Sequence, residues 1–392
     1  MSHHRWIVAA GTALLLLFGC TRTLAQEFRF SGQIRPRLET RDLTDVSGDG
    51  GGFVSMRTRL GVGVAINPSL RAFAQIQDVR VWGSEFSTTD GDADQLDLHQ
   101  AWAEIGAADE TTLRFGRQEA RYGNERLIGT LDWVQQGRSF DGLRATHPVG
   151  RARVDGFLFQ VAEEVAGFAD DGAIGGLYAT MPFGEHAAEA FGLWNTDAGS
   201  SQGTAGGRVV ARLGRALARL EGAAQFGERA SQDVSAHLLS AEIAIDVVDG
   251  VVIGALYDRL SGDDDPLDGE LHVFDTLYGT NHKFYGYADV FTNIPAHTGG
   301  RGLQDVALRG AWQPIQPLTL TLDAHRFLAA AGDGMSDEHF GDEIDLVATW
   351  RTSQNVGVSG GVFRFDPADG FGDIGRIEET LVATYVAVDV TF

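Results

Sequence analysis

Arginines at alternate positions are the residues whose type and spacing best suit chemistry in this sequence. Arg35 and Arg37 stand two residues apart, and so do Arg57 and Arg59. Side chains two residues apart on a β-strand point to the same face, so each pair presents two guanidinium groups together. The planar guanidinium matches a carboxylate, and Lys283 is the only lysine of the chain. The pattern therefore indicates recognition of anions.

Metal binding and catalysis are less well supported. A segment similar to the start of a calcium loop holds Asp90, Asp92 and Asp94. Gln95 stands where that loop needs glycine, and Ala101 where it needs a glutamate, so a solvated acidic loop and a loose calcium bridge to lipopolysaccharide both stay open. His282 is open between a loop ligand and a hydrogen-bonded structural histidine. The sequence has no G-x-S-x-G or H-E-x-x-H motif, so we expect no enzyme activity and no cofactor.

Charge and cysteine content narrow the class of protein further. The formal net charge of the 392 residues is −23, without basic runs, which argues against a nucleic-acid partner. Cys20 is the single cysteine, which excludes a disulfide framework and a cysteine-rich metal site.

Residues 1–25 have the pattern of a secretory signal peptide. A short basic start precedes residues 6–20, the only long apolar run, which is too short for a comfortable membrane helix. Cleavage after Ala25 removes this segment, and lipidation at Cys20 is the alternative. We therefore expect an exported protein with one domain, residues 26–392.

Alternation of apolar and polar residues recurs along almost the whole chain and predicts β-strands. It is clearest at 28–39, 54–66, 318–325, 343–350 and 382–392. The strands near 71–80 and 97–105 change phase midway, which indicates either bulges or different strand boundaries there. Two stacked soluble sheets would also alternate, so this pattern alone does not indicate a membrane.

The connections between these strands alternate in length. Short turns are expected at 67–69, 107–110, 147–150, 182–186, 214–216, 248–250, 313–317 and 352–355. Long acidic or glycine-rich loops are expected at 42–52, 83–95, 119–138, 162–171, 195–204, 228–235, 261–304, 330–341 and 366–378. Short periplasmic turns, longer extracellular loops and an even strand number are typical of bacterial outer-membrane barrels. We therefore predict an all-β protein: a single-chain, antiparallel transmembrane β-barrel of about 18 strands, with 16 as the alternative, in the bacterial outer membrane.

The barrel decides where charged side chains point. An arginine facing lipid at mid-membrane costs roughly 2–4 kcal/mol, so mid-strand arginines are expected to face the lumen. By alternation these are Arg35, Arg37, Arg57, Arg59, Arg71, Arg114, Arg144, Arg153, Arg208, Arg212 and Arg309. The inward acids are Glu39, Asp155, Glu189, Glu221, Glu242, Asp246, Asp323, Glu343 and Asp345. This predicts a basic wall facing a more acidic wall, which either lines a path for anions or neutralises itself and holds the barrel shape.

Four segments carry a resemblance to a known family. They are FRFSGQIRPRLETR at 28–41, LDLHQAWAEIG at 96–106, the long stretch at 112–147 and DTLYGTNHKFYGYADVF at 275–291. Together they resemble the alginate export family of outer-membrane porins, over nearly the whole chain and most specifically at 113–144. The resemblance implies a monomeric 18-stranded barrel with an electropositive constriction that passes an anionic uronate polysaccharide.

On the basis of this resemblance, the candidates for the selective path are Arg35, Arg37, Arg57, Arg59, Arg117, Arg138 and Arg144. The expected function is an outer-membrane channel for anionic saccharides or polysaccharide. A general or oligosaccharide-selective porin is the alternative, and a surface receptor or adhesin barrel is a further one. Expected partners besides the saccharide are outer-membrane lipid, lipopolysaccharide and the barrel assembly machinery, because the terminal Phe392 closes an alternating strand and resembles an assembly signal.

Aromatic residues near strand ends suit the girdles at the two membrane interfaces. Those expected in the girdles are Trp82, Trp102, Trp194, Trp312, Trp350 and Tyr385.

Overall fold

The computed structural model describes residues 27–41, 51–84, 96–107, 109–161, 172–197, 199–376 and 379–392. The expected signal peptide with Cys20 lies outside the described residues, and so do Asp90, Asp92 and Asp94. In the described part of the chain, no helix has the length and apolar character needed to cross a bilayer.

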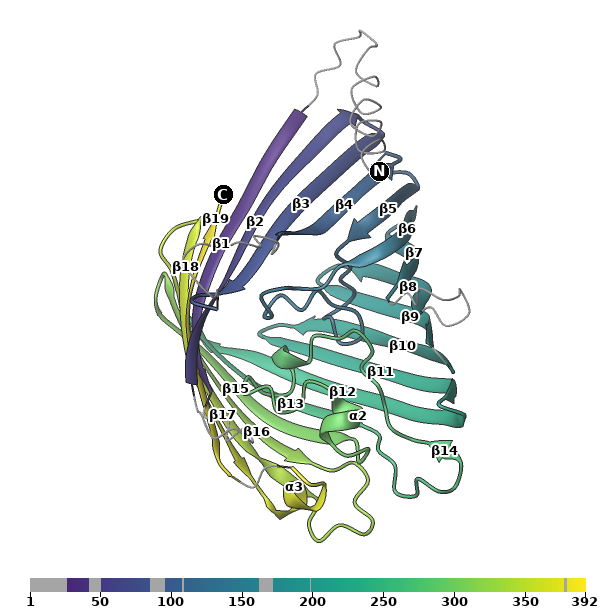
Figure 1. The fold of residues 1–392 in the computed structure, drawn as a ribbon, viewed down its shortest axis with the longest axis vertical. Helices are drawn as coiled ribbons and strands as arrows, with labels where there is room; N and C mark the ends of the chain where they lie inside the picture. Colours follow the sequence, from purple (N-terminus) through teal and green to yellow (C-terminus); the bar gives the residue numbers. More distant parts are fainter. Residues whose placement is uncertain are drawn as a thin grey trace, which may run out of the picture.

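Eighteen long antiparallel strands form the wall of the molecule, as the alternation predicts. They are β1 (Glu27–Arg41), β2 (Gly51–Asn67), β3 (Leu70–Val81), β4 (Leu96–Ile105), β5 (Thr112–Gln118), β6 (Phe140–Val149), β7 (Ala152–Gln160), β8 (Ala173–Phe183), β9 (His186–Asp197), β10 (Ser200–Leu213), β11 (Ala216–Arg229), β12 (Gln232–Val248), β13 (Val251–Leu260), β15 (Leu303–Ile315), β16 (Leu318–Leu328), β17 (His339–Arg351), β18 (Val356–Pro367) and β19 (Leu381–Thr391). A two-residue strand, β14 (Glu270–Leu271), lies in the connection from β13 to β15. Each long strand pairs with the next, and β1 pairs with β19, so the sheet closes into a barrel without an edge (Figure 1).

The ring closes at the last residue of the chain. Phe392 and Gly32 exchange two backbone hydrogen bonds, with N···O distances of 2.7 and 3.0 Å. A Cβ atom on Gly32 would lie only 2.3 Å from the Phe392 ring, so glycine is required for the ring to lie across β1. The terminal aromatic therefore covers the seam between the first and last strands.

Eight short connections lie where the sequence predicts them, at 68–69, 106–111, 150–151, 184–185, 214–215, 249–250, 316–317 and 352–355. Glycine adopts positive φ in several of these turns, such as Gly150 at 60° and Gly184 at 63°. Both described chain ends lie on the same side of the barrel as these turns, which is the expected periplasmic side.

The prediction of a long loop is wrong for two of the nine segments, 195–204 and 228–235. In the first segment β9 continues to Asp197 and β10 begins at Ser200, and in the second β11 and β12 are joined by a two-residue turn at 230–231. Ala230 and Ser231 both have positive φ, 49° and 66°, which is the backbone of a tight hairpin turn. The polar composition predicted loops, but strand pairing continues through it because the lumen side of a strand is itself polar.

The bulge expected in the second hairpin is present, since the pairing of β3 with β4 shifts register at Gln75 and Ile76. Four tryptophans expected in the girdles are exposed on the outer surface: Trp82 and Trp194 toward the long-loop side, and Trp312 and Trp350 toward the short turns. Tyr385 is buried and contacts Trp133 inside the barrel, so its assignment to the girdle is wrong. The assignment of Trp102 to the girdle is also wrong, because the guanidinium of the inward-facing Arg114 lies over the Trp102 ring.

Two connections fold into the ring of strands (Figure 1). The first inner loop, residues 119–139, joins β5 to β6. The second inner loop, residues 272–302, joins β14 to β15 and contains η2 (Asn281–Lys283) and α2 (Ile294–His297). Another short helix, α3 (Asp369–Asp373), lies in the connection from β18 to β19.

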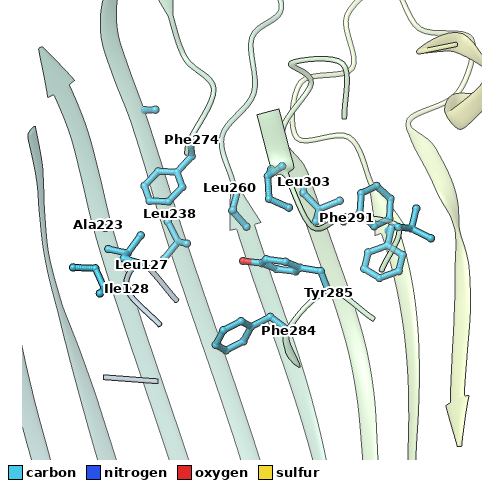
Figure 2. Packing of buried hydrophobic residues seen from close by; sticks show 14 of the residues in the cluster. Leu127, Ile128, Ala223, Leu238, Leu260, Phe274, Phe284, Tyr285, Phe291 and Leu303 are labelled. Atoms are coloured by element: carbon cyan, nitrogen blue, oxygen red, sulfur yellow. The ribbon is translucent and has the colours of Figure 1, made fainter. Parts of the chain in front are cut away.

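Apolar side chains hold both inner loops against the wall. Figure 2 shows Leu127 and Ile128 of the first inner loop beside Ala223 of β11, and Tyr285 of the second beside Leu260 of β13. These side chains are buried, and together they form the main hydrophobic core of the barrel. Because this core lies inside the barrel, the inner loops are integral parts of the fold.

Candidate functional site

Four inward-facing arginines on the first hairpin form the candidate site, and we refer to Arg35, Arg37, Arg57 and Arg59 as the arginine row. Arg35 and Arg57 are direct cross-strand neighbours in the pairing of β1 with β2. All four side chains are buried, and Arg57 is only 1% exposed. Like charges this close repel, so the fold must supply oxygen partners for them.

The first inner loop supplies most of these partners. Arg57 donates to the carboxylate of Asp132 at 2.8 Å and to the carbonyl of Gln135 at 3.4 Å. Arg35 donates to the side-chain oxygen of Gln135 at 3.0 Å and lies 3.7 Å from Asp132. One carboxylate of the loop therefore serves two arginines of the wall.

The outer members of the row contact the same loop. Arg37 donates to the carbonyl of Trp133 at 2.5 Å, and its guanidinium lies 4.1 Å from the centre of the Trp133 ring. Arg59 pairs with Glu119 at 3.2 Å and donates to the carbonyl of Gln136 at 3.3 Å. The row thus binds the loop over residues 132–136 as well as at its first residue.

The loop carboxylates are ionised in this arrangement. Burial opposes ionisation of Asp132, but Arg57, Arg35 and Arg59 outweigh it and hold the pKa of Asp132 below its ordinary value. Burial also opposes ionisation of Glu119, whose pKa is lowered by a hydrogen bond with His99 and by the charge of Arg59. The interaction between the row and the loop is therefore one between full charges at neutral pH.

The arginine row is placed between two hollows. One, of about 440 Å³, lies near the short turns and is lined by Arg35, Arg37 and Trp133 together with residues of β17, β18 and β19. The other, of about 400 Å³, is lined by Gln77, His99, Arg117, Gln136, Gly137 and neighbouring residues. The segment 133–137 contributes side chains or backbone to the lining of both hollows.

The opposite wall binds the inner loops through acids. Arg126 of the first inner loop is buried and donates to Asp258 of β13 at 2.6 Å and to Glu221 of β11 at 3.3 Å. The backbone amide of Ala288, in the second inner loop, donates to Glu343 of β17 at 2.8 Å. Both the arginine row and these acids therefore bind inner-loop groups of complementary charge or polarity.

The two inner loops also bind each other. Tyr278 exchanges backbone hydrogen bonds of 2.9 Å with Leu127 and Gly129. The rings of Trp133 and His282 stack with their centres 4.2 Å apart, and His282 pairs with Asp289 at 2.7 Å. His282 is therefore a hydrogen-bonded structural residue, and no group of metal-binding side chains is found among the described residues.

Comparison with known proteins identifies the family of this barrel. The sequence profile of the family described as Alginate export matches residues 26–171 and 199–376, which is more than half of the chain. The chain belongs to the Alginate export family. No curated protein sequence matches it.

Solved structures from Pseudomonas aeruginosa and Acinetobacter baumannii are similar to this barrel over most of its length. OccK3 (OpdO) of Pseudomonas aeruginosa has a TM-score of 0.65 at 14% identity, over 93% of this chain and 96% of that chain. OccAB4 of Acinetobacter baumannii has a TM-score of 0.66 at 10% identity, over 93% and 98%. The outer membrane protein opdK of P. aeruginosa has a TM-score of 0.65 at 11% identity, over 93% and 98%. This similarity concerns the fold, and with the family it shows that this Alginate export protein is an outer-membrane barrel channel.

The remaining candidates of the selective path lie apart from the arginine row. Arg117 is out of phase with the inward-facing Arg114, pairs with Asp141 at 2.7 Å and is 39% exposed. Arg138 belongs to the first inner loop and donates to the carbonyl of Tyr278, and burial lowers its pKa to about 10. Arg144 faces a separate hollow near the short turns. The seven predicted arginines thus do not form one continuous line.

Sequence reasoning missed the residues that connect wall and loops. Asp132, Trp133 and Arg126 lie in a segment predicted only as an outer loop, and Asp258 was not among the inward acids. A signal was present, since residues 127–134 contain five apolar side chains in a supposedly solvated loop. Such a run predicts burial, and inside a barrel the place for burial is the lumen.

Proposed function

We propose that this Alginate export protein conducts anionic saccharides of the uronate type along the arginine row. The observation that carries the proposal is the set of partners of the row. Four guanidinium groups bind two loop carboxylates, backbone carbonyls and a side-chain amide oxygen, and a uronate chain offers carboxylate and hydroxyl oxygens that can accept hydrogen bonds in their place. A passing carboxylate can therefore replace Asp132 without leaving an arginine unpaired.

This exchange gives the channel a mechanism for opening. With residues 132–137 bound, the hollows on either side are separated, and the arginines are satisfied by the loop. Entry of a uronate into the hollow lined by Arg35 and Arg37 brings a competing carboxylate to the row. Because guanidinium forms bidentate bonds with carboxylate, the substrate displaces the loop at little net cost and moves from one arginine to the next.

The other candidate residues have supporting roles in the proposal. Arg138 holds the first inner loop to the second, and Arg117 lies beside the hollow on the far side of the loop. A single chain closes its own barrel, so we propose that one copy forms the pore. The two inner loops fold into the lumen rather than outward, which favours a channel over a surface receptor.

The proposal is tested by the ion selectivity of the pore in planar bilayers. Under a salt gradient the wild-type channel should prefer anions, despite the net charge of −23 of the chain. The double variant Arg57→Glu and Arg59→Glu should lower or invert the reversal potential, because it reverses two charges in the lumen. A matched control is Arg326→Glu with Arg364→Glu, which makes the same change in net charge at two exposed arginines.

Block of the current identifies the solute class. Tetragalacturonate should block the wild-type pore, and maltotetraose, a neutral sugar of equal length, should not. Equal effects of the two sugars would indicate a general oligosaccharide porin. A wild-type pore that prefers cations, or selectivity unchanged in the double variant, would refute conduction of anions along the row.

A further inference from the structure

Two carboxyl groups of β17 that the proposed function does not use bind the second inner loop. The backbone amide of Ala288 donates to Glu343 at 2.8 Å, and that of Tyr287 donates to Asp345 at 3.2 Å. Glu343 and Asp345 are two residues apart on the strand, so both point to the lumen. We refer to residues 284–288 of the loop as the clasp, because these bonds fasten it to the wall.

Further contacts fix the position of the clasp. A Cβ on Gly286 would lie 2.3 Å from a carboxylate oxygen of Glu343, so glycine is required for the backbone to approach this closely. The carbonyl of Phe284 accepts from Arg309 of β15 at 3.1 Å. The rings of Phe284 and Tyr285 are buried (Figure 2).

The two carboxyl groups are closed off from water. Glu343 is 0% exposed and Asp345 is 1% exposed. They lie within hydrogen-bonding reach of each other, yet Oε2 of Glu343 and Oδ1 of Asp345 are buried without any partner. Ionised carboxylates only accept hydrogen bonds, so two of them at this distance repel and leave these oxygens unsatisfied. A single proton between the two groups removes both costs, because it makes one group a donor to the other.

The other acids around this pair have basic partners. On β15 and β16 and in the second inner loop, these ion pairs are His325 with Asp305 at 2.9 Å, Arg309 with Asp323 at 3.7 Å and His282 with Asp289 at 2.7 Å. The neighbouring strand β18 places the apolar Phe363 and Phe365 opposite the pair. Neither Glu343 nor Asp345 has an ion-pair partner in the described part of the chain, and a proton can take that place.

We propose that Glu343 and Asp345 share one proton and that this proton holds the clasp on the wall, so that the second inner loop is released as the pH rises. Loss of the proton leaves two adjacent buried negative charges, which are relieved when the clasp moves away and water enters. Release frees lumen space beside β17, and the channel thereby responds to pH. The inference goes beyond the proposed function and does not depend on the conducted solute.

The size of the pH effect follows from the number of protons bound. With the clasp attached the pair holds one proton, and with the clasp released both groups are in water and ionised at neutral pH. The attached state therefore binds one proton more, and each unit of rising pH should weaken the attachment by about tenfold. Tyr287 does not contribute between about pH 6 and about pH 8, because burial raises its pKa to about 12.

Hydrogen exchange of the folded barrel in detergent measures the attachment. The amides of Tyr287 and Ala288 are bonded to the pair, and exchange of a peptide that contains them is followed between about pH 6 and about pH 8. After correction for the intrinsic pH dependence of exchange, protection in the wild type should fall by about tenfold per pH unit. Amides of β16 and β17 serve as the internal reference.

Glu343→Gln is the decisive variant, because its neutral amide group can donate to Asp345 at every pH. Protection of the clasp should then stay high and lose its pH slope, and Asp345→Asn should give the same result. The matched control is Asp342→Asn, which removes a carboxylate of the same strand that faces outward and pairs with Arg326 at 2.8 Å. This control should keep the wild-type slope. Heat-modifiable migration in gels checks that each variant forms the barrel.

Infrared spectroscopy detects the proton itself, independently of the loop. At about pH 7, the difference spectrum between wild type and Glu343→Gln should contain the carbonyl stretch of a protonated carboxyl group. Asp342→Asn should give no such band in its difference spectrum, because its carboxylate is exposed and paired with an arginine.

The outcomes decide for or against the shared proton. A slope that is absent from Glu343→Gln and kept in Asp342→Asn supports it. An equal slope in wild type and Glu343→Gln assigns the proton elsewhere, first to His325 opposite Glu343 on β16, and overturns the proposal. Protection that depends on the calcium or sodium concentration instead of pH places a metal ion between the carboxyl groups and also overturns it. Absence of the infrared band overturns it even where the slope cannot be compared.

Discussion

Binding of the first inner loop by the arginine row can be tested with two substitutions of graded strength. Asp132→Asn removes the carboxylate that accepts from Arg57 at 2.8 Å and leaves the neighbouring carbonyl contacts in place. Arg57→Met removes the guanidinium itself and with it the bonds to Asp132, Gln135 and Gln33. If the row holds the loop, both variants should increase the fraction of molecules in which the loop is detached, and Arg57→Met should do so more.

The expected magnitudes follow from burial. A hydrogen bond to a charged group contributes about 1.5–3 kcal/mol when buried. The side chain of Asp132 is 60% exposed to the lumen, so water screens the pair and the loss is about 1 kcal/mol, or about fivefold in the opening equilibrium. Arg57 is 1% exposed and makes three such bonds, so Arg57→Met should cost roughly 2–3 kcal/mol, about thirty- to hundredfold.

Amide hydrogen exchange measures this equilibrium directly. The amide of Arg138 donates to the carbonyl of Thr130 at 2.7 Å, and the amide of Val134 donates to that of Leu131 at 3.0 Å. These bonds lie within the loop, so their exchange rates report its opening. Amides in β1 and β2 act as the internal reference, and Arg212→Gln, which breaks a 3.3 Å pair with Asp246, is the matched control.

The pH dependence has a defined sign. The pKa of Asp132 is lower in the bound loop than in a detached one, so its contribution is complete at neutral pH. The contribution is lost only as the pH falls below the ordinary range of an aspartate, through the lowered pKa. Loop exchange, corrected for its intrinsic pH dependence, should therefore accelerate in acid in the wild type, and less steeply in Asp132→Asn, in which only the pair of Glu119 and Arg59 still contributes. Equal loop protection in wild type and Arg57→Met would refute the role of the row in holding the loop.

Two further predictions concern assembly and the acidic wall. Deleting Phe392 should lower the amount of heat-modifiable barrel in the outer membrane without affecting passage across the inner membrane. Gly32→Val should have the same effect, because the new side chain displaces the Phe392 ring. Normal levels of both variants in membrane fractions would contradict this prediction. Arg126→Met should destabilise the attachment of the inner loops by about 3–5 kcal/mol, because Asp258 stays buried and unpaired. Adding Asp258→Asn to this variant should recover much of the loss. Hydrogen exchange of the Tyr278 amide measures both effects, and a double variant without recovery would show that the pair is not the cause.

The strands and their short turns could be predicted from the sequence because each strand separates lipid from the polar lumen. A barrel strand has lipid on one side and water or polar groups on the other, so alternation with period two is visible in the sequence. The short turns need residues that tolerate positive φ, and glycines such as Gly150 and Gly214 mark them. Both signals are local, and both therefore survive without any knowledge of the three-dimensional arrangement.

The long-loop ends of the strands could not be predicted from the same signals. Where a strand extends beyond the membrane it needs no apolar face toward lipid, so residues 195–204 and 228–235 have the composition of loops. Their pairing is set by the register of the neighbouring strands, in which Gln202 of β10 lies opposite Asn195 of β9. Composition reports the solvent around a segment, and pairing depends on the neighbouring strand.

The direction of the inner loops was hidden for a different reason. Whether residues 119–139 turn outward or inward depends on partners that are distant in the sequence. Arg126 binds Asp258, which is more than a hundred positions away, and Asp132 binds Arg57, which is 75 positions away. The sequence predicts that these charges need partners but does not identify them.

The selectivity that we propose for this channel depends on local charge rather than on the total charge of the chain. The inner loops bring Asp132 and Glu119 to the basic wall and Arg126 to the acidic wall, so each wall is partly neutralised where the loops bind. Detaching residues 132–137 would expose the arginines again without exposing the pair of Arg126 and Asp258, which is buried. In the proposed function an anion can thus compete for the arginine row while a cation gains nothing at the buried pair, so we expect the lumen to favour anions although the whole chain is strongly acidic.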